Sequence, residues 1–460
     1  MLIVHNPRHA EHQGRHEMFR GRLVPCHESA ARLEFVRAEL RARGVSTLAE
    51  PGEVDMALLR RIHSPRYLDF LAGAWDEWVA LDPANAELDI LPSVWPVRGF
   101  RDDILPANFA ARVGLFSFDS GTPMTAGTWA AAQAGAVCAI DAARAVLAAS
   151  GPRAAALALT RPPGHHAGAD FFGGYCFLNN SALAAQALRD GGARRVAVLD
   201  IDYHHGNGTQ SIFYERADVL TLSLHGDPHT EYPFFLGHAD ETGAGAGLGA
   251  NLNLPLPAGT DFRSWRAALD HALGQVARAG VDALVVALGV DTFEGDPIST
   301  FRLASADYLQ VGRALAGAAL PTVFVMEGGY AVRVRRRADV TMGSSDGLRD
   351  GRRLRGARGR HQRCQRAGGL RGLNDCSVVV HEEAPGRRRG AAPSFLAPPR
   401  GVAARPPGGL QFKPAASRVR AGSSAAPGAA RTPGLPRRSA SGGRRRRARR
   451  ARRPGRCGGR

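Results

Sequence analysis

Two residues with metal-binding side chains follow one of the most apolar runs of the chain. Asp202 and His204 come directly after residues 195–201, Arg-Val-Ala-Val-Leu-Asp-Ile, and such a run is typical of a strand buried on both faces. Alternate residues of a strand point the same way, so the carboxylate and the imidazole can converge on one point. Together they can bind a divalent metal, and zinc suits them best. For an isolated Asp-x-His, a buried ion pair is the simpler alternative.

This Asp-x-His is not isolated, because three other apolar runs also end on reactive side chains. Each run predicts a buried strand: His165 and His166 follow 154–159, Asp291 follows 284–290, and Tyr330 follows 322–327. Open α/β sheets bind their ligands at the carboxyl edge of the strands. The order of the four segments therefore predicts one site that contains a histidine pair, an Asp with a His, a second Asp and a tyrosine.

These motifs resemble the arginase–deacetylase superfamily, specifically its zinc-dependent histone deacetylase and acetylpolyamine amidohydrolase group. The resemblance covers about residues 1–332 and rests on RPPGHHAG at 161–168, GGYCFLNN at 173–180, DIDYHHGNGTQ at 200–210, SLHGDP at 223–228, GVDTFEGDP at 289–297 and EGGY at 327–330. Asn207 and Glu327 resemble the acetylpolyamine and class II-like branch. Class I histone deacetylases more usually carry Asp at the first of these positions.

The fold expected for residues 1–332 is one large α/β domain of the three-layer arginase/deacetylase type. Its strand candidates are 1–4, 155–159, 196–201, 219–224, 284–289 and 322–327, and its clearest helical stretches are 127–147, 179–189 and 262–279. Strands that alternate with helices predict a mostly parallel central sheet with helices on both faces.

The site residues implied by this resemblance divide into four groups. Asp202, His204 and Asp291 would bind one catalytic zinc ion and leave positions open for water and substrate. His166 would act as general base and then acid, with Asn207 behind it, and His165 would steady the water, with Asp200 behind it. Tyr330 would donate a hydrogen bond to the developing oxyanion. A structural potassium ion is implied at Asp200, Asp202, His204, Ser223 and Leu224.

The substrate side of the site is also read from the resemblance. Gly174, Tyr175 and Tyr232 match positions that line a narrow tunnel for an alkyl-amine chain. Segment 92–122 looks like the insertion with which polyamine-type members narrow the entrance and form a homodimer. The acidic gate residues expected there fall on Ala110 and Gly121, which are not acidic; the candidates to replace them are Asp102, Asp103 and Asp119.

The charge of the chain divides at about residue 332. Residues 1–332 contain 26 Arg, no Lys and 36 Asp+Glu, a balance of −10, whereas residues 333–460 have a balance of +28, so the net charge is +18. An acidic catalytic domain suits a cationic substrate. The Arg/Gly/Pro/Ala-rich segment 333–460 cannot bury a core and is predicted to be disordered.

Three interpretations of segment 333–460 remain open. It is a basic arm that binds nucleic acid non-specifically, through 444–453 above all, or a solvated tail without a role, or the product of a frameshift, which we favour. One Lys against 59 Arg indicates GC-rich coding DNA, and out-of-frame GC-rich codons yield mainly Arg, Ala, Gly and Pro. The family continues past its Gly-Gly-Tyr with a closing helix, which is missing here.

The resulting hypothesis is a zinc-dependent amidohydrolase that deacetylates polyamines or similar primary amines. The alternative in the same class is a protein (histone-like) lysine deacetylase. In another class, the chain is a non-catalytic or misfolded product with a nucleic-acid-binding basic tail. The six cysteines show no metal-ribbon spacing and no disulfide framework, which favours reduced thiols and a cytoplasmic location. No apolar run approaches the ~18 residues of a membrane span, so no membrane partner is expected.

Overall fold

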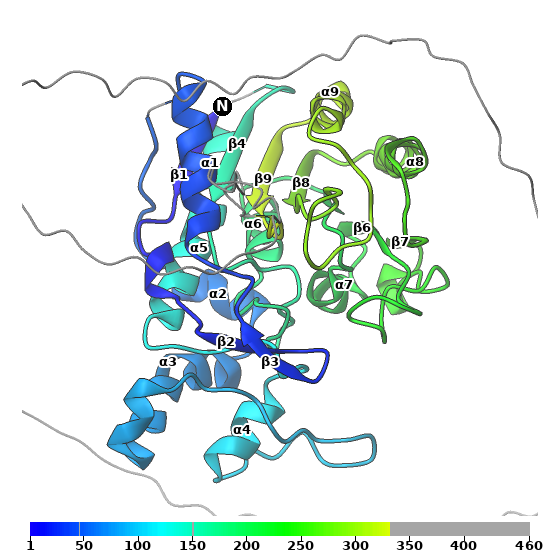
Figure 1. The fold of residues 1–460 in the computed structure, drawn as a ribbon. Coiled ribbons are helices and arrows are strands. Elements are labelled where there is room, and N and C mark those ends of the chain that lie inside the picture. The colour runs from blue at the N-terminus through cyan, green and yellow to red at the C-terminus, as the bar shows by residue number, and fades with distance from the viewer. Residues whose placement is uncertain (46, 150, 332–460) are drawn as a thin grey trace, which may run out of the picture. The chain divides into compact units, whose positions relative to one another are not determined.

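The computed structural model describes residues 1–331, apart from residues 46 and 150. At the centre of this part of the chain lies a seven-stranded sheet in the order β1-β4-β9-β8-β5-β6-β7 (Figure 1). Every neighbouring pair in it is parallel. Its strands are Leu2–His5 (β1), Ala155–Leu159 (β4), Val196–Asp200 (β5), Val219–Gly226 (β6), Asn251–Leu256 (β7), Ala283–Leu288 (β8) and Thr322–Met326 (β9). Segment 333–460 and the expected position of a closing helix lie outside the described residues.

Helices cover both faces of this sheet. The α-helices of the described residues are Ala31–Ala42 (α1), Met56–Ile62 (α2), Pro65–Leu81 (α3), Phe109–Leu115 (α4), Thr128–Ala148 (α5), Asn180–Asp190 (α6), Asn207–Phe213 (α7), Phe262–Ala279 (α8) and Asp307–Gly317 (α9). Helices α1 and α5 to α9 pack against the strands, whereas α3 and α4 lie beside the sheet (Figure 1). The predicted α/β architecture of three layers is therefore confirmed.

Strand β5 contributes side chains to two hydrophobic cores, one on each face of the sheet. Its side chains alternate, so Val196 and Val198 join the core that contains α5 and α6, whereas Ala197 and Leu199 join the core that contains α8 and α9. Helix α1 covers β1, β4 and β9 through Leu33 in a third, smaller cluster. A strand buried on both faces must be apolar throughout, which is why these runs were recognisable in the sequence.

Helix α5 is long and apolar enough to span a membrane by length and composition alone. The sequence analysis had predicted no stretch of this kind. In the fold it packs on α6, β4 and β1, and 61% of its most apolar window is buried. Small side chains explain both properties: residues 130–148 are rich in alanine, which lets the helix approach its neighbours closely. It is thus a core helix of this domain.

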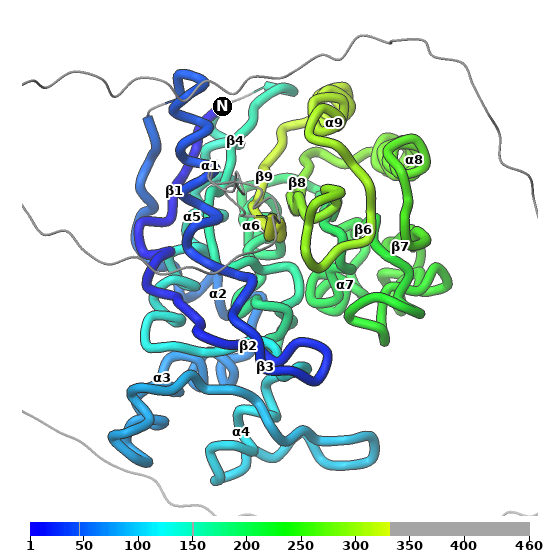
Figure 2. Tube along the Cα trace, in the orientation of Figure 1, coloured from blue at the N-terminus to red at the C-terminus, as the bar shows by residue number. Residues whose placement is uncertain are grey.

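The topology brings the predicted site together. Strands β4, β9, β8 and β5 are direct neighbours, and the segments that follow them carry the histidine pair, Tyr330, Asp291 and the Asp-x-His. The trace in Figure 2 follows these strands from β1 and β4 at one edge to β6 and β7 at the other. Parallel neighbours place their carboxyl ends at one edge, so side chains more than 160 positions apart in sequence meet there.

A two-stranded hairpin lies apart from the main sheet and was not predicted. Its strands are His16–Phe19 (β2) and Arg22–Pro25 (β3), which pair antiparallel with Phe19 opposite Arg22. Arg20 and Gly21 form the turn, and both have positive φ, 49° and 77°. Two successive positive φ values are typical of the type I′ turn of tight hairpins. This hairpin contributes residues to the pocket described below.

Candidate active site

Asp202, His204 and Asp291 meet beyond the ends of β5 and β8. Their potential ligand atoms all lie within 4.8 Å of one another, and all three residues are buried. Nδ1 of His204 lies 3.0 Å from Oδ2 of Asp291 and 3.4 Å from Oδ1 of Asp202. Two buried carboxylates that face one imidazole repel each other unless a cation lies between them. The donor set fits a divalent metal ion.

Backbone groups fix the orientation of both carboxylates. Asp202 accepts hydrogen bonds from the N–H of His204 (2.9 Å) and of Gly328 (2.8 Å), and Asp291 accepts one from the N–H of Tyr203 (2.8 Å). Gly328 has to be a glycine here, because a Cβ at this position would lie 2.5 Å from Oδ2 of Asp202. The positions of these potential ligand atoms are thus fixed by backbone hydrogen bonds of the fold.

A second group of potential ligands, His165, Cys176 and Glu327, also lies within 4.8 Å, but its atoms are already used. Glu327 accepts hydrogen bonds from the N–H of Gly164 (2.6 Å) and of His165 (3.1 Å), and from the hydroxyl of Ser181 (2.9 Å). Burial raises the pKa of the Cys176 thiol, so no thiolate is available. We interpret this group as the support of the histidine loop. The sequence analysis used Glu327 only as a marker of the family branch and missed this role.

The histidine pair is held by two different partners. Nδ1 of His165 lies 2.9 Å from Oδ2 of Asp200, and Nδ1 of His166 lies 2.6 Å from Oδ1 of Asn207. With the amide oxygen toward the ring, Nδ1 of His166 carries the hydrogen and its Nε2 is left as an acceptor. Both predicted pairings, Asp200 behind His165 and Asn207 behind His166, are therefore present in the structure.

The two imidazoles also differ in their electrostatic surroundings. Burial lowers the pKa of His166, and the neighbouring His165 and His204 lower it further. Burial acts in the same direction on His165, but the charges of Asp200 and Asp202 outweigh it and raise the pKa of His165 to about 10. A neutral His166 can accept a proton, whereas a charged His165 can stabilise negative charge beside it.

Tyr330 follows β9 at the same edge of the sheet. Its backbone N–H donates to Asp296 (2.6 Å), and the guanidinium carbon of Arg32 lies 4.5 Å from the centre of its ring. Arg32 also donates to the carbonyl oxygens of Gly329 (2.6 Å) and Glu327, so it fixes the segment before the tyrosine. Burial raises the pKa of the Tyr330 hydroxyl, which keeps it protonated and able to donate a hydrogen bond.

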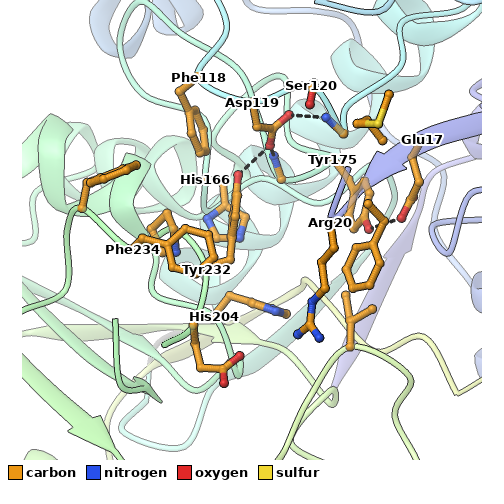
Figure 3. Close-up of a pocket in the computed structure, with 18 of the residues that line it drawn as sticks. Glu17, Arg20, Phe118, Asp119, Ser120, His166, Tyr175, His204, Tyr232 and Phe234 are labelled. Atoms are coloured by element: carbon orange, nitrogen blue, oxygen red, sulfur yellow. Dashed lines mark hydrogen bonds between the residues drawn. The ribbon is translucent and has the colours of Figure 1, made fainter. Parts of the chain in front are cut away.

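A cavity of about 660 Å³ leads to these groups, with His166, His204 and Tyr330 in its lining (Figure 3). Aromatic rings form much of the wall, and Tyr232 stacks on Phe118 with their centroids 5.7 Å apart. The three predicted substrate-binding positions, Gly174, Tyr175 and Tyr232, all line this cavity. An elongated, largely apolar chain with a reactive end suits such a space.

Three carboxylates line this cavity, Glu231 and two that are hydrogen-bonded to its tyrosines. Asp119 accepts hydrogen bonds from the hydroxyl of Tyr232 (2.6 Å), the N–H of Gly174 (2.6 Å) and the N–H of Gly121 (3.0 Å) (Figure 3). Glu17 of β2 accepts one from the hydroxyl of Tyr175 (3.0 Å), and burial raises its pKa to about 7.

Of the three candidates for an acidic gate residue, the structure brings only Asp119 to the pocket. Neither Asp102 nor Asp103 is part of the lining, and Asp103 forms an exposed ion pair with Arg101. The sequence analysis missed Glu17, because a short N-terminal strand carries no pattern that relates it to residues 150 positions later.

The residues expected at a potassium ion also lie together. In the register of β5 and β6, Asp200 is opposite Ser223, and Leu224 follows on the same buried strand. A small cavity of about 10 Å³ is lined by Asp200 and Ser223 together with residues of α7 and β7, but Asp202, His204 and Leu224 are not part of its lining. Asp200 thus faces His165 and lies beside this space as well.

Comparison with known proteins agrees with this geometry. The histone deacetylase domain model matches residues 26–342, and the chain belongs to this family of metal-dependent deacetylases. Its catalytic machinery is that of an amidohydrolase.

The names of individual similar proteins are more specific than the name of the family. Acetylpolyamine amidohydrolases 2 and 1 of Pseudomonas aeruginosa are each 50% identical to this chain, over 332 and 333 residues, which is 72% of this chain and 94% of each relative. The acetylpolyamine amidohydrolase of Mycoplana ramosa is 44% identical over 332 residues, 72% of this chain and 95% of the relative. The crystal structure of acetylpolyamine aminohydrolase from Burkholderia pseudomallei is similar with a TM-score of 0.67 and 38% identity, covering 72% of this chain and 94% of that one.

Proposed function

We propose that this chain is a zinc-dependent amidohydrolase that removes acetyl groups from acetylated polyamines and similar primary-amine conjugates. The products are acetate and the free amine. The observation that carries the proposal is the meeting of the Asp202–His204–Asp291 group, the histidine pair and Tyr330 at one end of an aromatic cavity. Residues 1–332 form the catalytic domain in this proposal.

The protein groups have distinct parts in the reaction. Asp202, His204 and Asp291 would hold the zinc ion, which supplies Lewis-acid polarisation of the amide carbonyl and of a water molecule. His166 accepts the proton of the attacking water at Nε2 while Asn207 holds its Nδ1–H. His166 then returns this proton to the nitrogen of the leaving amine as the carbon–nitrogen bond breaks.

The negative charge that develops on the carbonyl oxygen is met by two groups. Tyr330 donates its hydroxyl hydrogen to that oxygen, and the positive charge of His165 lies beside His166, with ring centroids 4.0 Å apart. Asp200 keeps His165 protonated at Nδ1. These groups are positioned before substrate binds, so they cost little reorganisation during the reaction.

The substrate assignment is supported by the names of the 50% identical relatives and by two carboxylates of the cavity, Asp119 and Glu17. A protonated amine at the far end of the substrate would be attracted to them. The test compares kcat/KM for N-acetylputrescine with kcat/KM for an acetyl-lysine peptide. Faster turnover of the peptide would instead favour the protein lysine deacetylase.

Additional proposals concern ions, assembly and location. A structural potassium ion is proposed at Asp200, Asp202, His204, Ser223 and Leu224.

A homodimer is proposed through segment 92–122, which exposes the apolar side chains of Val94, Val97, Phe100, Ile104 and Leu105. The described cysteines, Cys26, Cys138 and Cys176, are free thiols, which supports a cytoplasmic location.

Segment 333–460 is proposed to bind nucleic acid non-specifically, because its charge balance is +28. Binding of this kind is driven by counterion release, so retention on nucleic acid should collapse between ~50 and 200 mM salt. The native chain is compared with a chimera in which the residues after Val332 are replaced by the sequence encoded in the alternative reading frame. An active, more soluble chimera would support the frameshift; an inactive chimera beside an active native chain would show that the tail belongs to the working protein.

A further inference from the structure

One guanidinium group projects into the mouth of the pocket. Arg20 occupies the first position of the tight turn between β2 and β3 and lines the cavity. Its φ of 49° is uncommon for a residue with a side chain, and together with the positive φ of Gly21 it defines the turn that sets the direction of this side chain. Figure 3 shows Arg20 extending across the cavity between Tyr175 and His204.

This charge is not neutralised by the protein. Within the described part of the chain the guanidinium of Arg20 pairs with no carboxylate. It contacts the ring of Phe19, with its central carbon 5.2 Å from the ring centroid. Other exposed arginines, such as Arg101 with Asp103, do form ion pairs. The positive charge of Arg20 is therefore available to a ligand.

Carboxylates also line this cavity, Glu17 on the hairpin of Arg20 itself and two others outside this hairpin. Asp119 is held by three hydrogen bonds, and the half-buried Glu231 is also part of the lining. Asp119 and Glu231 attract the free ammonium group of an acetylated diamine, whereas Arg20 repels this group wherever it approaches the turn. A ligand that carries both an ammonium and a carboxylate can pair its ammonium with these carboxylates and its carboxylate with Arg20.

We propose that Arg20 forms a carboxylate-binding subsite, and that this enzyme also deacetylates free ω-N-acetylated amino acids, of which Nε-acetyl-lysine is the simplest probe. The acetamide lies at the catalytic end, the α-ammonium faces Asp119 and Glu231, and the α-carboxylate meets Arg20. A guanidinium binds a carboxylate through two parallel hydrogen bonds, which adds geometric selectivity to the attraction. The inference rests on the proposed amide hydrolysis and names a further substrate class for the same site.

The test uses two substrates that differ only in the carboxylate. Free Nε-acetyl-lysine is N-acetylcadaverine with one added α-carboxylate, so the ratio of their kcat/KM values isolates that group. R20A should lower kcat/KM for Nε-acetyl-lysine by about three- to ten-fold, as expected for a partly exposed, hydrogen-bonded ion pair. It should raise kcat/KM for N-acetylcadaverine, because the substitution removes the charge that repels the ammonium group of this substrate.

Two controls accompany this comparison. R22A removes an exposed arginine of the same hairpin that does not line the cavity, and it should leave the ratio unchanged. Nε-acetyl-lysine amide keeps the ammonium but lacks the carboxylate, so R20A should not lower kcat/KM for its hydrolysis.

The outcomes separate this inference from the proposed function. No hydrolysis of either substrate by the wild-type enzyme would overturn the proposed function itself. Hydrolysis of N-acetylcadaverine without measurable hydrolysis of Nε-acetyl-lysine would overturn only the subsite. An Nε-acetyl-lysine to N-acetylcadaverine ratio that is the same in wild type and R20A would also overturn it.

Discussion

Nδ1 of His166 lies 2.6 Å from the side-chain oxygen of Asn207. The amide can orient the imidazole but cannot carry charge, so it does less than a carboxylate would to favour the protonated ring. His165, next in the chain, has the carboxylate of Asp200 in the equivalent place. The chemical difference between these two partners separates an imidazole that accepts protons from one that stays charged.

This pairing predicts the pH dependence of Asn207→Asp. The new carboxylate should raise the pKa of His166, so that protonation removes the general base at a higher pH. The acidic limb of the kcat/KM profile should therefore move upward by about one unit. The control is Asn108→Asp, because Asn108 is exposed and directly precedes α4. An unchanged acidic limb would contradict the assignment of His166 as the base.

Removal of one metal ligand tests the Asp202–His204–Asp291 group. Asp291→Ala should lose both zinc retention and activity, because three protein ligands cannot be reduced to two without loss of the site's geometry. Metal content per chain is measured by plasma mass spectrometry after dialysis. Asp270→Ala, an exposed carboxylate on α8, should keep its metal. Stoichiometric zinc and full activity in Asp291→Ala would rule the assignment out.

The hydroxyl of Tyr330 can be removed without removing its ring. Tyr330→Phe should lower kcat by about 10²–10³-fold, the loss associated with one oxyanion donor, while zinc content stays the same. The ring keeps its packing against Arg32, so folding should not change. If the substitution raises KM alone, the hydroxyl binds substrate in the ground state and does not act on the transition state.

His63, at the end of α2, gives the folded protein a dependence on pH. Its Nδ1 lies 2.9 Å from the carbonyl oxygen of Gly168, and its Nε2 accepts a hydrogen bond from the N–H of Asn179 (3.0 Å). The carbonyl accepts from Nδ1–H, and Nε2 can accept from the N–H of Asn179 only while it carries no hydrogen, so the second contact requires the neutral ring. Burial lowers the pKa of His63 to about 4.

Stability should consequently fall as the pH drops from 6.5 towards 4. In this window the unfolded chain binds a proton at His63 and the folded chain does not, so protonation favours unfolding. His63→Gln cannot ionise. Between pH 7 and 4 the wild type should lose roughly 2–3 kcal/mol more unfolding free energy than this variant. Urea denaturation at several pH values measures the difference, and parallel curves would show that His63 does not titrate as described.

Local sequence located six of the seven strands of the central sheet and the three helices that the sequence analysis named. Helix α8, Phe262–Ala279, has the predicted bounds, because Asp261 accepts a hydrogen bond from Ser264 at its start and Gly280 adopts a left-handed conformation at its end. Strand β4 also has the predicted bounds. Strand β7 was missed because it lies at the edge of the sheet, where alternating Asn, Leu and Pro residues replace a continuous apolar run.

Each motif of the reactive centre could be read from the sequence, because each follows an apolar strand and parallel strands end at a common edge. The charged residues of the pocket wall could not be located in this way: two were missed, and Asp119 was only one of three candidates. Glu17, Arg20 and Asp119 reach the pocket from a hairpin and a loop whose positions depend on packing against distant elements. Hydrophobic periodicity reports only on neighbours along the chain, whereas the charge that faces a substrate is decided by which loops the tertiary fold brings together.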